Sequence, residues 1–309
     1  MLIHDIFRLT AEENVYFVEE SYASLKNNAL SLHYLEKIPR GAQEEIIGLR
    51  DENGDVTGVA VYNQETEDSP AFWAIFTCLI SSKPAQNENC RKFLKIAGNL
   101  NIKTFRQTSS RELNDAVIEY YSHALLDRQL CENCRISKEP YEMVYIESRN
   151  ARLKDLVNKY KLRGDILEIC CGNGMSTLPL HELGYAPLAV DNDKCQICQG
   201  LEHNVLDLKR TIVLDATRLS QFFTEKSFDT IVGFMLGMIY SYNRELWERI
   251  MEESAKILKP GGMILLTVYK KEEIEILGKA LEKCGVKGNI IDNTDSKGIY
   301  DQWVYIGNK

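Results

Sequence analysis

The segment DILEICCGNGMSTLPL, residues 165–180, constrains the fold more than any other part of the chain. A short apolar run, typical of a buried strand, contains Glu168, and two cysteines and two glycines then precede a helical stretch. Glycines at such a turn let the backbone approach a ligand, and the free N–H groups of the following helix attract anions. The pattern predicts either a ligand-binding turn or a plain strand-to-helix connection.

From about residue 149 onward, short apolar runs alternate with stretches of helical periodicity. This alternation predicts a parallel sheet covered by helices. The five runs are 165–170, 186–191, 211–216, 228–234 and 262–269. The last two apolar segments, GNIIDNT and YDQWVYIG, predict a terminal β-hairpin. The expected fold class is therefore α/β, a doubly wound, mostly parallel seven-stranded sheet with a terminal β-hairpin.

The clearest helical pattern in this half covers residues 243–259 and is ended by Pro260 and two glycines. One apolar face of this helix is expected to consist of Leu246, Ile250, Ala255 and Leu258.

The N-terminal half predicts a small α+β domain. Two strands would meet at a turn formed by Asn53 and Gly54, a third strand would follow in SPAFWAIFTCLIS, and residues 87–100 and 111–130 have helical periods. We expect an N-terminal domain over residues 1–135 and a C-terminal domain over residues 136–309. The polar stretch 131–140 would link them.

Composition narrows the class of protein. No apolar run approaches the roughly 18 residues of a membrane span, and charges near the N-terminus argue against a signal peptide, so we expect a cytoplasmic protein without membrane contact. Nine cysteines in 309 residues, without the dense spacing of a disulfide scaffold, favour reduced thiols. Residues 1–149 hold 23 Asp and Glu against 16 Lys and Arg, and neither half has a basic excess, so no nucleic-acid partner is expected.

Five segments, in order, carry a resemblance to a known family: ILEICCGNG, AVDND, LDATRL, FDTIVGF and LKPGGMILL. They resemble the motifs of class I S-adenosylmethionine-dependent methyltransferases over about residues 141–309, except that Cys170 stands where the first motif has its first glycine. The resemblance implies a Rossmann-like fold, S-adenosylmethionine as cofactor and in-line methyl transfer. A nicotinamide cofactor is disfavoured because Thr177 occupies the position of that fingerprint's third glycine.

The resemblance also implies which residues bind the cofactor. Backbone at the glycine turn would hold its methionine part, and Glu168 would act through its amino group or an ordered water. Asp191 would bind the ribose hydroxyls, and Asp215 with the Ala216 backbone would recognise the adenine. Tyr145 or Tyr141 would close over the methionine end. The implied cofactor-binding set is Glu168, Cys171, Gly172, Gly174, Asp191, Asp215, Ala216 and Tyr145. Purely local roles remain alternatives: Glu168 as a charge facing water, Asp215 as a turn former, Asp191 as a helix N-cap.

The acceptor pocket of the family lies past the fourth strand, here FMLGMIYSYN. This segment lacks the Asn/Asp-Pro-Pro-Tyr/Phe sequence associated with methylation of planar amino nitrogens. Met235, Met238 and Tyr240, with Tyr242, instead indicate an apolar or aromatic wall, or else simply pack a helix beneath the sheet. The expected acceptor is a small molecule or a protein side chain, and the N-terminal domain would recognise it or act as a lid. The sequence assigns no catalytic residue and no oligomeric state.

Two other functions stay open. Cys170 in place of glycine favours a cofactor-binding regulator that has lost transfer. The pairs Cys131/Cys134 and Cys195/Cys198 have the ligand count of a four-thiolate site, which would suit an enzyme handling a metal or metalloid. Small core packing is the favoured interpretation of these cysteines, so no metal site is predicted.

Overall fold

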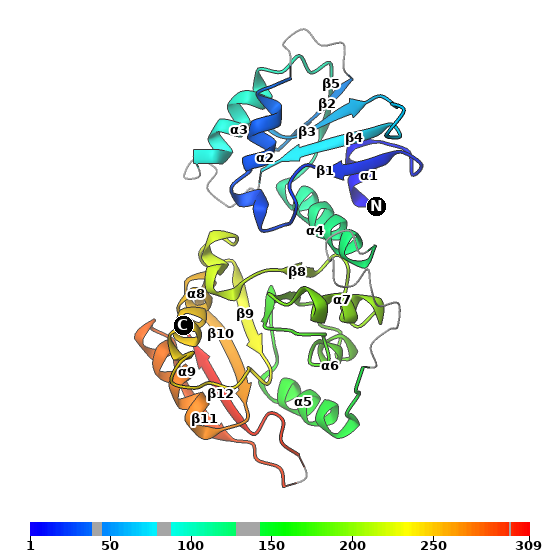
Figure 1. Cartoon of the computed structure of the whole chain (residues 1–309). Helices are drawn as coiled ribbons and strands as arrows, with labels where there is room; N and C mark the ends of the chain where they lie inside the picture. Colours follow the sequence, from blue (N-terminus) through cyan, green and yellow to red (C-terminus); the bar gives the residue numbers. More distant parts are fainter. Residues whose placement is uncertain (39–44, 79–87, 128–142, 297) are drawn as a thin grey trace. The chain divides into compact units, whose positions relative to one another are not determined.

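The structure, a computed structural model, describes residues 1–38, 45–78, 88–127, 143–296 and 298–309 (Figure 1). The chain forms two compact units, Met1–Ala124 and Leu125–Lys309. The predicted domain boundary between residues 135 and 136 lies outside the described residues and stays a prediction.

The N-terminal unit is built on a five-stranded sheet with the order β1-β4-β3-β2-β5. Its strands are β1 (Asn14–Phe17), β2 (Ile46–Arg50), β3 (Val56–Asn63), β4 (Phe72–Thr77) and β5 (Thr104–Gln107). Its helices are α1 (Leu2–Phe7), α2 (Ala29–Leu35), α3 (Glu88–Gly98), α4 (Ser110–Leu126) and the 3₁₀ helix η1 (Ser24–Lys26). The outer strands β1 and β5 each pair in parallel with their neighbour, and the inner pairings are antiparallel.

The predicted hairpin of this unit is confirmed as β2 and β3. Gly54 adopts a φ of 85°, a left-handed conformation that glycine accepts without strain. The Asp51 carboxylate accepts hydrogen bonds from the backbone N–H groups of Asn53 and Asp55, each at 2.9 Å. The hairpin turn is thus stabilised by hydrogen bonds from its own backbone to the side chain of Asp51, a local interaction typical of aspartate at turns.

The C-terminal unit contains the predicted seven-stranded sheet, in the order β11-β12-β10-β9-β6-β7-β8 (Figure 1). Its strands are β6 (Ile166–Ile169), β7 (Leu188–Asp191), β8 (Thr211–Val213), β9 (Phe228–Gly233), β10 (Leu258–Val268), β11 (Lys287–Asp292) and β12 (Trp303–Asn308). Only β12 runs antiparallel to its neighbours, so the mostly parallel sheet with a terminal hairpin is confirmed.

Helices cover both faces of this sheet. They are α5 (Glu147–Tyr160), α6 (Thr177–Glu182), α7 (Lys194–Glu202), α8 (Arg244–Ile257), α9 (Lys271–Lys283) and the 3₁₀ helix η4 (Ala216–Gln221). Val304 lies in one hydrophobic cluster with Leu153 of α5 and Leu180 of α6. Its neighbour Tyr305 contacts Gly278 of α9. Because successive strand residues point to opposite faces, α5 and α6 cover one face and α9 the other.

The predicted apolar face of the helix at 243–259 was partly wrong. Leu246 is 49% exposed, whereas its neighbour Trp247, about 100° further round the helix, is 8% exposed and takes the inward position. Leu258 belongs to β10, which begins before Pro260 and continues after a register irregularity between Leu258 and Met263. Ile250 and Ala255 are buried as predicted.

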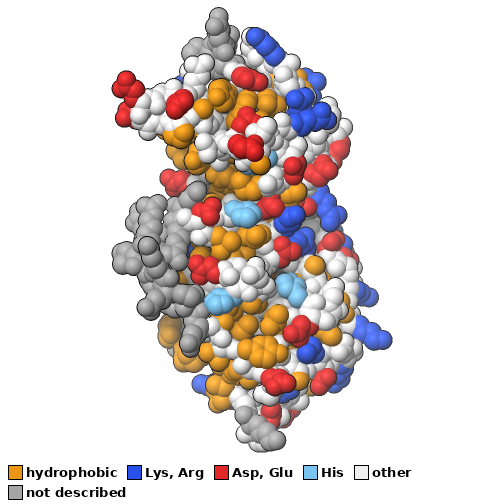
Figure 2. Space-filling model, turned by 90° about the vertical axis from the view of Figure 1, so that its right-hand side faces the viewer, with side chains coloured by type: hydrophobic (Ala, Val, Ile, Leu, Met, Phe, Trp, Pro, Cys, Tyr) orange, Lys and Arg blue, Asp and Glu red, His pale blue; other side chains and the backbone are white. Residues whose placement is uncertain are grey.

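The surface carries charged side chains of both signs, as the composition of the chain predicts. On the face shown in Figure 2, Lys and Arg side chains are interspersed with Asp and Glu side chains rather than gathered in one stripe. No helix in the described part of the chain is long and apolar enough to cross a membrane.

We expect Ile250→Ala to lower the free energy of unfolding by about 2–4 kcal/mol, because Ile250 is 5% exposed and its loss leaves a cavity. The matched control, Leu246→Ala on the same helix, should cost less than about 1 kcal/mol. Urea denaturation of both variants measures the difference. Equal costs would contradict the assignment of the buried face of α8.

Candidate functional site

The turn between β6 and α6 has three residues in left-handed backbone conformation: Cys170, Gly172 and Gly174, with φ of 54°, 54° and 83°. The two glycines serve different purposes. A Cβ on Gly174 would come within 2.7 Å of the Leu206 side chain, so packing requires glycine there. A Cβ on Gly172 would meet only the Gln196 side chain, at 3.8 Å, so Gly172 faces open space.

Asp191, the last residue of β7, holds this turn in place. Its Oδ2 accepts a hydrogen bond from Gly172 N at 2.9 Å, and its Oδ1 accepts one from Asp193 N at 2.8 Å. Asp193, not Asp191, is the N-cap of α7, since its carboxylate accepts from Cys195 N and Gln196 N. The alternative interpretation of Asp191 as a helix N-cap was therefore wrong.

Glu168 on β6 is fully buried, which rules out a charge facing water. Neither carboxylate oxygen accepts a hydrogen bond from any residue that the structure describes. Burial raises the pKa of Glu168 to about 8, although the Thr177 hydroxyl and the charge of Arg149 lower it in part. The Thr177 hydroxyl is close enough for this effect but lacks the geometry of a hydrogen bond, so Glu168 remains unpartnered.

Three acidic residues lie near enough to Cys170 to act on its thiol through their charges. Burial raises the pKa of its thiol to about 12, and the charges of Asp191, Asp215 and Glu168 add to that rise. The fold thus brings together carboxylates from β6, from β7 and from the segment after β8. They gather where the parallel strands end, which is where doubly wound folds bind ligands.

Asp215 and Ala216 follow β8. Asp215 Oδ1 accepts hydrogen bonds from Thr217 N at 2.8 Å and Thr217 Oγ1 at 2.7 Å, so it caps η4. This local role was the alternative that the sequence left open. Its Oδ2 accepts no hydrogen bond from the described residues. Ala216 is 7% exposed.

Sequence reasoning missed Arg149 of α5. Its Nε donates to Asp301 Oδ2 at 2.8 Å, and its Nη2 donates to Ser176 Oγ at 2.9 Å beside the glycine turn. Asp301 is 1% exposed and also accepts from the hydroxyl of Thr267, which in turn accepts from Met235 N. Because 152 positions separate Arg149 from Asp301, no local pattern could have indicated this pair.

The segment after β9 is exposed. Met238, Tyr240 and Tyr242 are 57%, 39% and 83% exposed. The two tyrosine rings stack with centroids 5.3 Å apart, and Tyr240 Oη donates to Met238 Sδ at 3.0 Å. The exposure of Met238, Tyr240 and Tyr242 excludes the alternative that they pack a helix beneath the sheet. Met235 differs from them, since it is half-buried and has a left-handed conformation with a φ of 51°.

Tyr145 precedes α5 and is 51% exposed, and no hydrogen bond or ring contact joins it to the glycine turn among the described residues. Tyr141, Cys131 and Cys134 lie outside those residues. Cys198 is buried in a hydrophobic cluster with Leu201, as the packing interpretation expects, whereas Cys195 is exposed, so that interpretation was wrong for Cys195. Within the described ranges, no group of three or more His, Cys, Asp or Glu side chains could hold a metal ion.

A family model described as "Methyltransferase domain" matches residues 166–262, from β6 into β10. This match covers the glycine turn, Asp191, Asp215 and the exposed aromatic segment. Together with the strand order and the acids at the strand ends, it identifies the C-terminal unit as an S-adenosylmethionine-dependent methyltransferase domain. The cofactor of this domain is S-adenosylmethionine.

No curated protein matches the chain. Among solved structures, a protein from Pyrococcus horikoshii OT3 is 20% identical and aligns with 57% of this chain and 98% of its own, with a TM-score of 0.43. A SAM-dependent methyltransferase from Archaeoglobus fulgidus is 16% identical over 53% of this chain and 94% of its own, with a TM-score of 0.40. Geranyl diphosphate C-methyltransferase from Streptomyces coelicolor A3(2) is 15% identical over 52% and 80%, with a TM-score of 0.40.

The left-handed conformation of Cys170 generates a prediction. The left-handed conformation destabilises a non-glycine residue in the folded state by about 1–2 kcal/mol. A non-glycine residue also has less conformational entropy in the unfolded state, which offsets part of this destabilisation. Cys170→Gly should therefore raise the free energy of unfolding by up to about 1 kcal/mol, and leave cofactor affinity within about tenfold. Denaturation and calorimetry measure the two effects. A large loss of stability or of binding would assign the thiol a role of its own.

The buried carboxyl of Glu168 makes stability depend on pH. Its pKa is about 8 in the folded protein against an ordinary value of 4.5, so the folded state keeps a proton that the unfolded state loses between these values. Stability should therefore fall as pH rises from about 4.5 to 8, by up to about 1.4 kcal/mol per pH unit from this group.

Glu168→Gln is neutral at every pH, so the variant without ligand should be more stable than the parent at pH 8, with a margin that shrinks toward pH 5. Urea denaturation across this range measures it, with the exposed Glu225→Gln as the control. A pH-independent difference would contradict the burial of an unpartnered carboxyl.

Proposed function

We propose that the chain transfers a methyl group from S-adenosylmethionine to an apolar or aromatic acceptor, by in-line displacement. The observation that carries this proposal is Glu168, a carboxyl near the end of β6 that is fully buried, lacks a hydrogen-bond partner among the described residues and has a raised pKa. Burying such a group costs free energy unless a ligand supplies the missing hydrogen bonds. Perturbed carboxyls of this kind concentrate at functional sites.

The residues at the strand ends fit the chemistry of this cofactor. Glu168 would accept hydrogen bonds from its ammonium group, and the open space at Gly172 would admit its methionine part. Each Asp191 oxygen uses one backbone N–H and keeps lone-pair capacity for a ribose hydroxyl. Asp215 Oδ2 and the Ala216 backbone would recognise the adenine edge. When bound, the cofactor supplies an electrophilic methyl group on a sulfonium sulfur.

The acceptor class is argued from the segment after β9. Met238, Tyr240 and Tyr242 place an exposed surface with two stacked rings there, which suits a flat apolar or aromatic acceptor better than an anionic one. Displacement at a methyl group needs alignment and exclusion of water, and these side chains would provide both. No general base is required for an acceptor that is already nucleophilic.

Two further proposals concern the whole chain. The N-terminal domain would recognise the acceptor, because a Rossmann-like domain needs no such addition to bind its cofactor. A regulator that binds the cofactor without transfer is the second candidate function, favoured by Cys170 in the position of a glycine.

Mass spectrometry of a cell extract incubated with the protein and methyl-labelled S-adenosylmethionine tests transfer directly. A labelled product that requires the protein supports the enzyme and identifies the acceptor. Tight cofactor binding without any labelled product, in extract or with added aromatic acceptors, would favour the regulator.

A matched pair of variants tests the assignment of Asp191. Asp191→Asn should weaken binding of S-adenosylmethionine and of its demethylated product by roughly 2–4 kcal/mol, since charge-assisted hydrogen bonds to the ribose are lost. Asp193→Asn, two residues further on, keeps a good N-cap for α7 and should bind normally. Calorimetry measures both, and equal affinity in the two variants would remove Asp191 from the site.

A further inference from the structure

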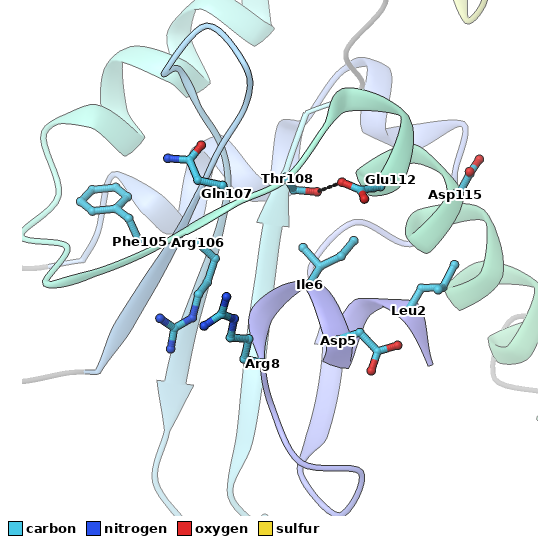
Figure 3. Close-up of a pocket in the computed structure, with 10 residues that line it drawn as sticks. All are labelled: Leu2, Asp5, Ile6, Arg8, Phe105, Arg106, Gln107, Thr108, Glu112 and Asp115. Atoms are coloured by element: carbon cyan, nitrogen blue, oxygen red, sulfur yellow. Dashed lines mark hydrogen bonds between the residues drawn. The ribbon is translucent and has the colours of Figure 1, made fainter.

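The N-terminal unit has a cavity of its own, far in sequence from the methyltransferase motifs. Its volume is about 560 Å³, and its walls come from α1, β5 and the start of α4 (Figure 3). Pockets of about 300–1,000 Å³ are typical of small-molecule sites. The strand β5 is at the edge of the five-stranded sheet, so the cavity lies along an edge that no other strand of the described residues covers.

Two arginines line this cavity. Arg8 follows the C-terminal end of α1 and Arg106 lies on β5, and Figure 3 shows both guanidinium groups directed to the same part of the cavity. Neither side chain has an ion pair or hydrogen bond with a residue that the structure describes, and the Nε of Arg106 is buried without a partner. A buried donor left unpaired is costly, and two nearby guanidinium groups repel each other.

The walls around these arginines are fixed in advance. Phe105 lies against Gly48, where an added Cβ would come within 2.8 Å of the ring, and the Arg50 guanidinium stacks on that ring at 3.7 Å from its centroid. Arg8 is held in a left-handed conformation with a φ of 58° as the C-cap of α1. Such strain in a non-glycine residue is retained mostly where the surroundings or a function require it.

The acidic residues of the cavity do not neutralise the arginines. Glu112 Oε2 accepts hydrogen bonds from the backbone N–H and the hydroxyl of Ser109, just before α4, and no ion pair joins Glu112 to either arginine among the described residues. Asp5 on α1 and Asp115 on α4 are directed away from the two guanidinium groups in Figure 3. The cavity therefore has a cationic part formed by the two arginines, and its remaining walls include the apolar side chains of Leu2 and Ile6 and the two aspartates.

We propose that this cavity binds a small organic anion, whose carboxylate or phosphate oxygens are held by the guanidinium groups of Arg8 and Arg106. The planar fork of arginine matches both oxyanions, and a ligand oxygen would satisfy the unpaired Nε of Arg106. Hydroxyl or amino groups elsewhere on the ligand would face Asp5 and Asp115. Every residue that forms this site lies in the N-terminal unit, and none belongs to the methyltransferase motifs.

Calorimetric titration of the full-length protein with inorganic phosphate and with succinate, each at constant ionic strength, tests the proposal. We expect saturable binding of at least one anion, weakened at least tenfold by Arg106→Gln and by Arg8→Gln. Tighter binding of phosphate would indicate a phosphate ester as the natural ligand, and tighter binding of succinate a carboxylate. Arg91→Gln, which removes an exposed arginine of α3, is the matched control and should bind as the parent does.

Far-UV circular dichroism and S-adenosylmethionine binding report whether each variant is folded. Arg8 is exposed, so Arg8→Gln decides the question even where Arg106→Gln loses its fold. The proposal is overturned when the parent binds neither anion, or when the folded arginine variants bind with unchanged affinity.

Discussion

The C-terminal site depends on the hydrogen bonds that the carboxylate of Asp191 accepts. By accepting from Gly172 N and Asp193 N, it joins the turn after β6 to the turn after β7. This connection fixes the left-handed conformations at Cys170 and Gly172 and keeps the space beside Gly172 open. A carboxylate that satisfies backbone donors and still has free lone pairs is suited to bind hydroxyl groups as well.

Glu168 lowers the stability of the fold, and the proposed function gives a reason for its presence. A neutral side chain would fit its buried position better, yet the chain keeps a carboxyl there whose pKa is raised to about 8. Arg149 offsets part of this cost through its charge, while its own hydrogen bonds go to Asp301 and Ser176. Proteins commonly tolerate such a destabilising group where a ligand uses it. The proposed ligand group here is an ammonium.

The strands of the C-terminal sheet, its terminal hairpin and the position of the glycine turn could be predicted because apolar runs, turn residues and spacing are local signals. The buried face of a helix was less predictable. Leu246 and Trp247 are adjacent on α8, and in the folded protein the larger Trp247 side chain is buried while Leu246 is exposed. The Arg149–Asp301 pair and the cavity with Arg8 and Arg106 could not be predicted at all. Each joins residues far apart in sequence, and only the folded sheet brings them together.

The most direct test of the central claim is an infrared difference spectrum recorded at pH 7 on addition of the demethylated cofactor, S-adenosylhomocysteine. If Glu168 meets the ammonium group of the ligand, the band of its protonated carboxyl disappears on binding, and the Glu168→Gln variant shows no such change. A carboxyl band that persists unchanged in the fully bound parent protein would contradict the account.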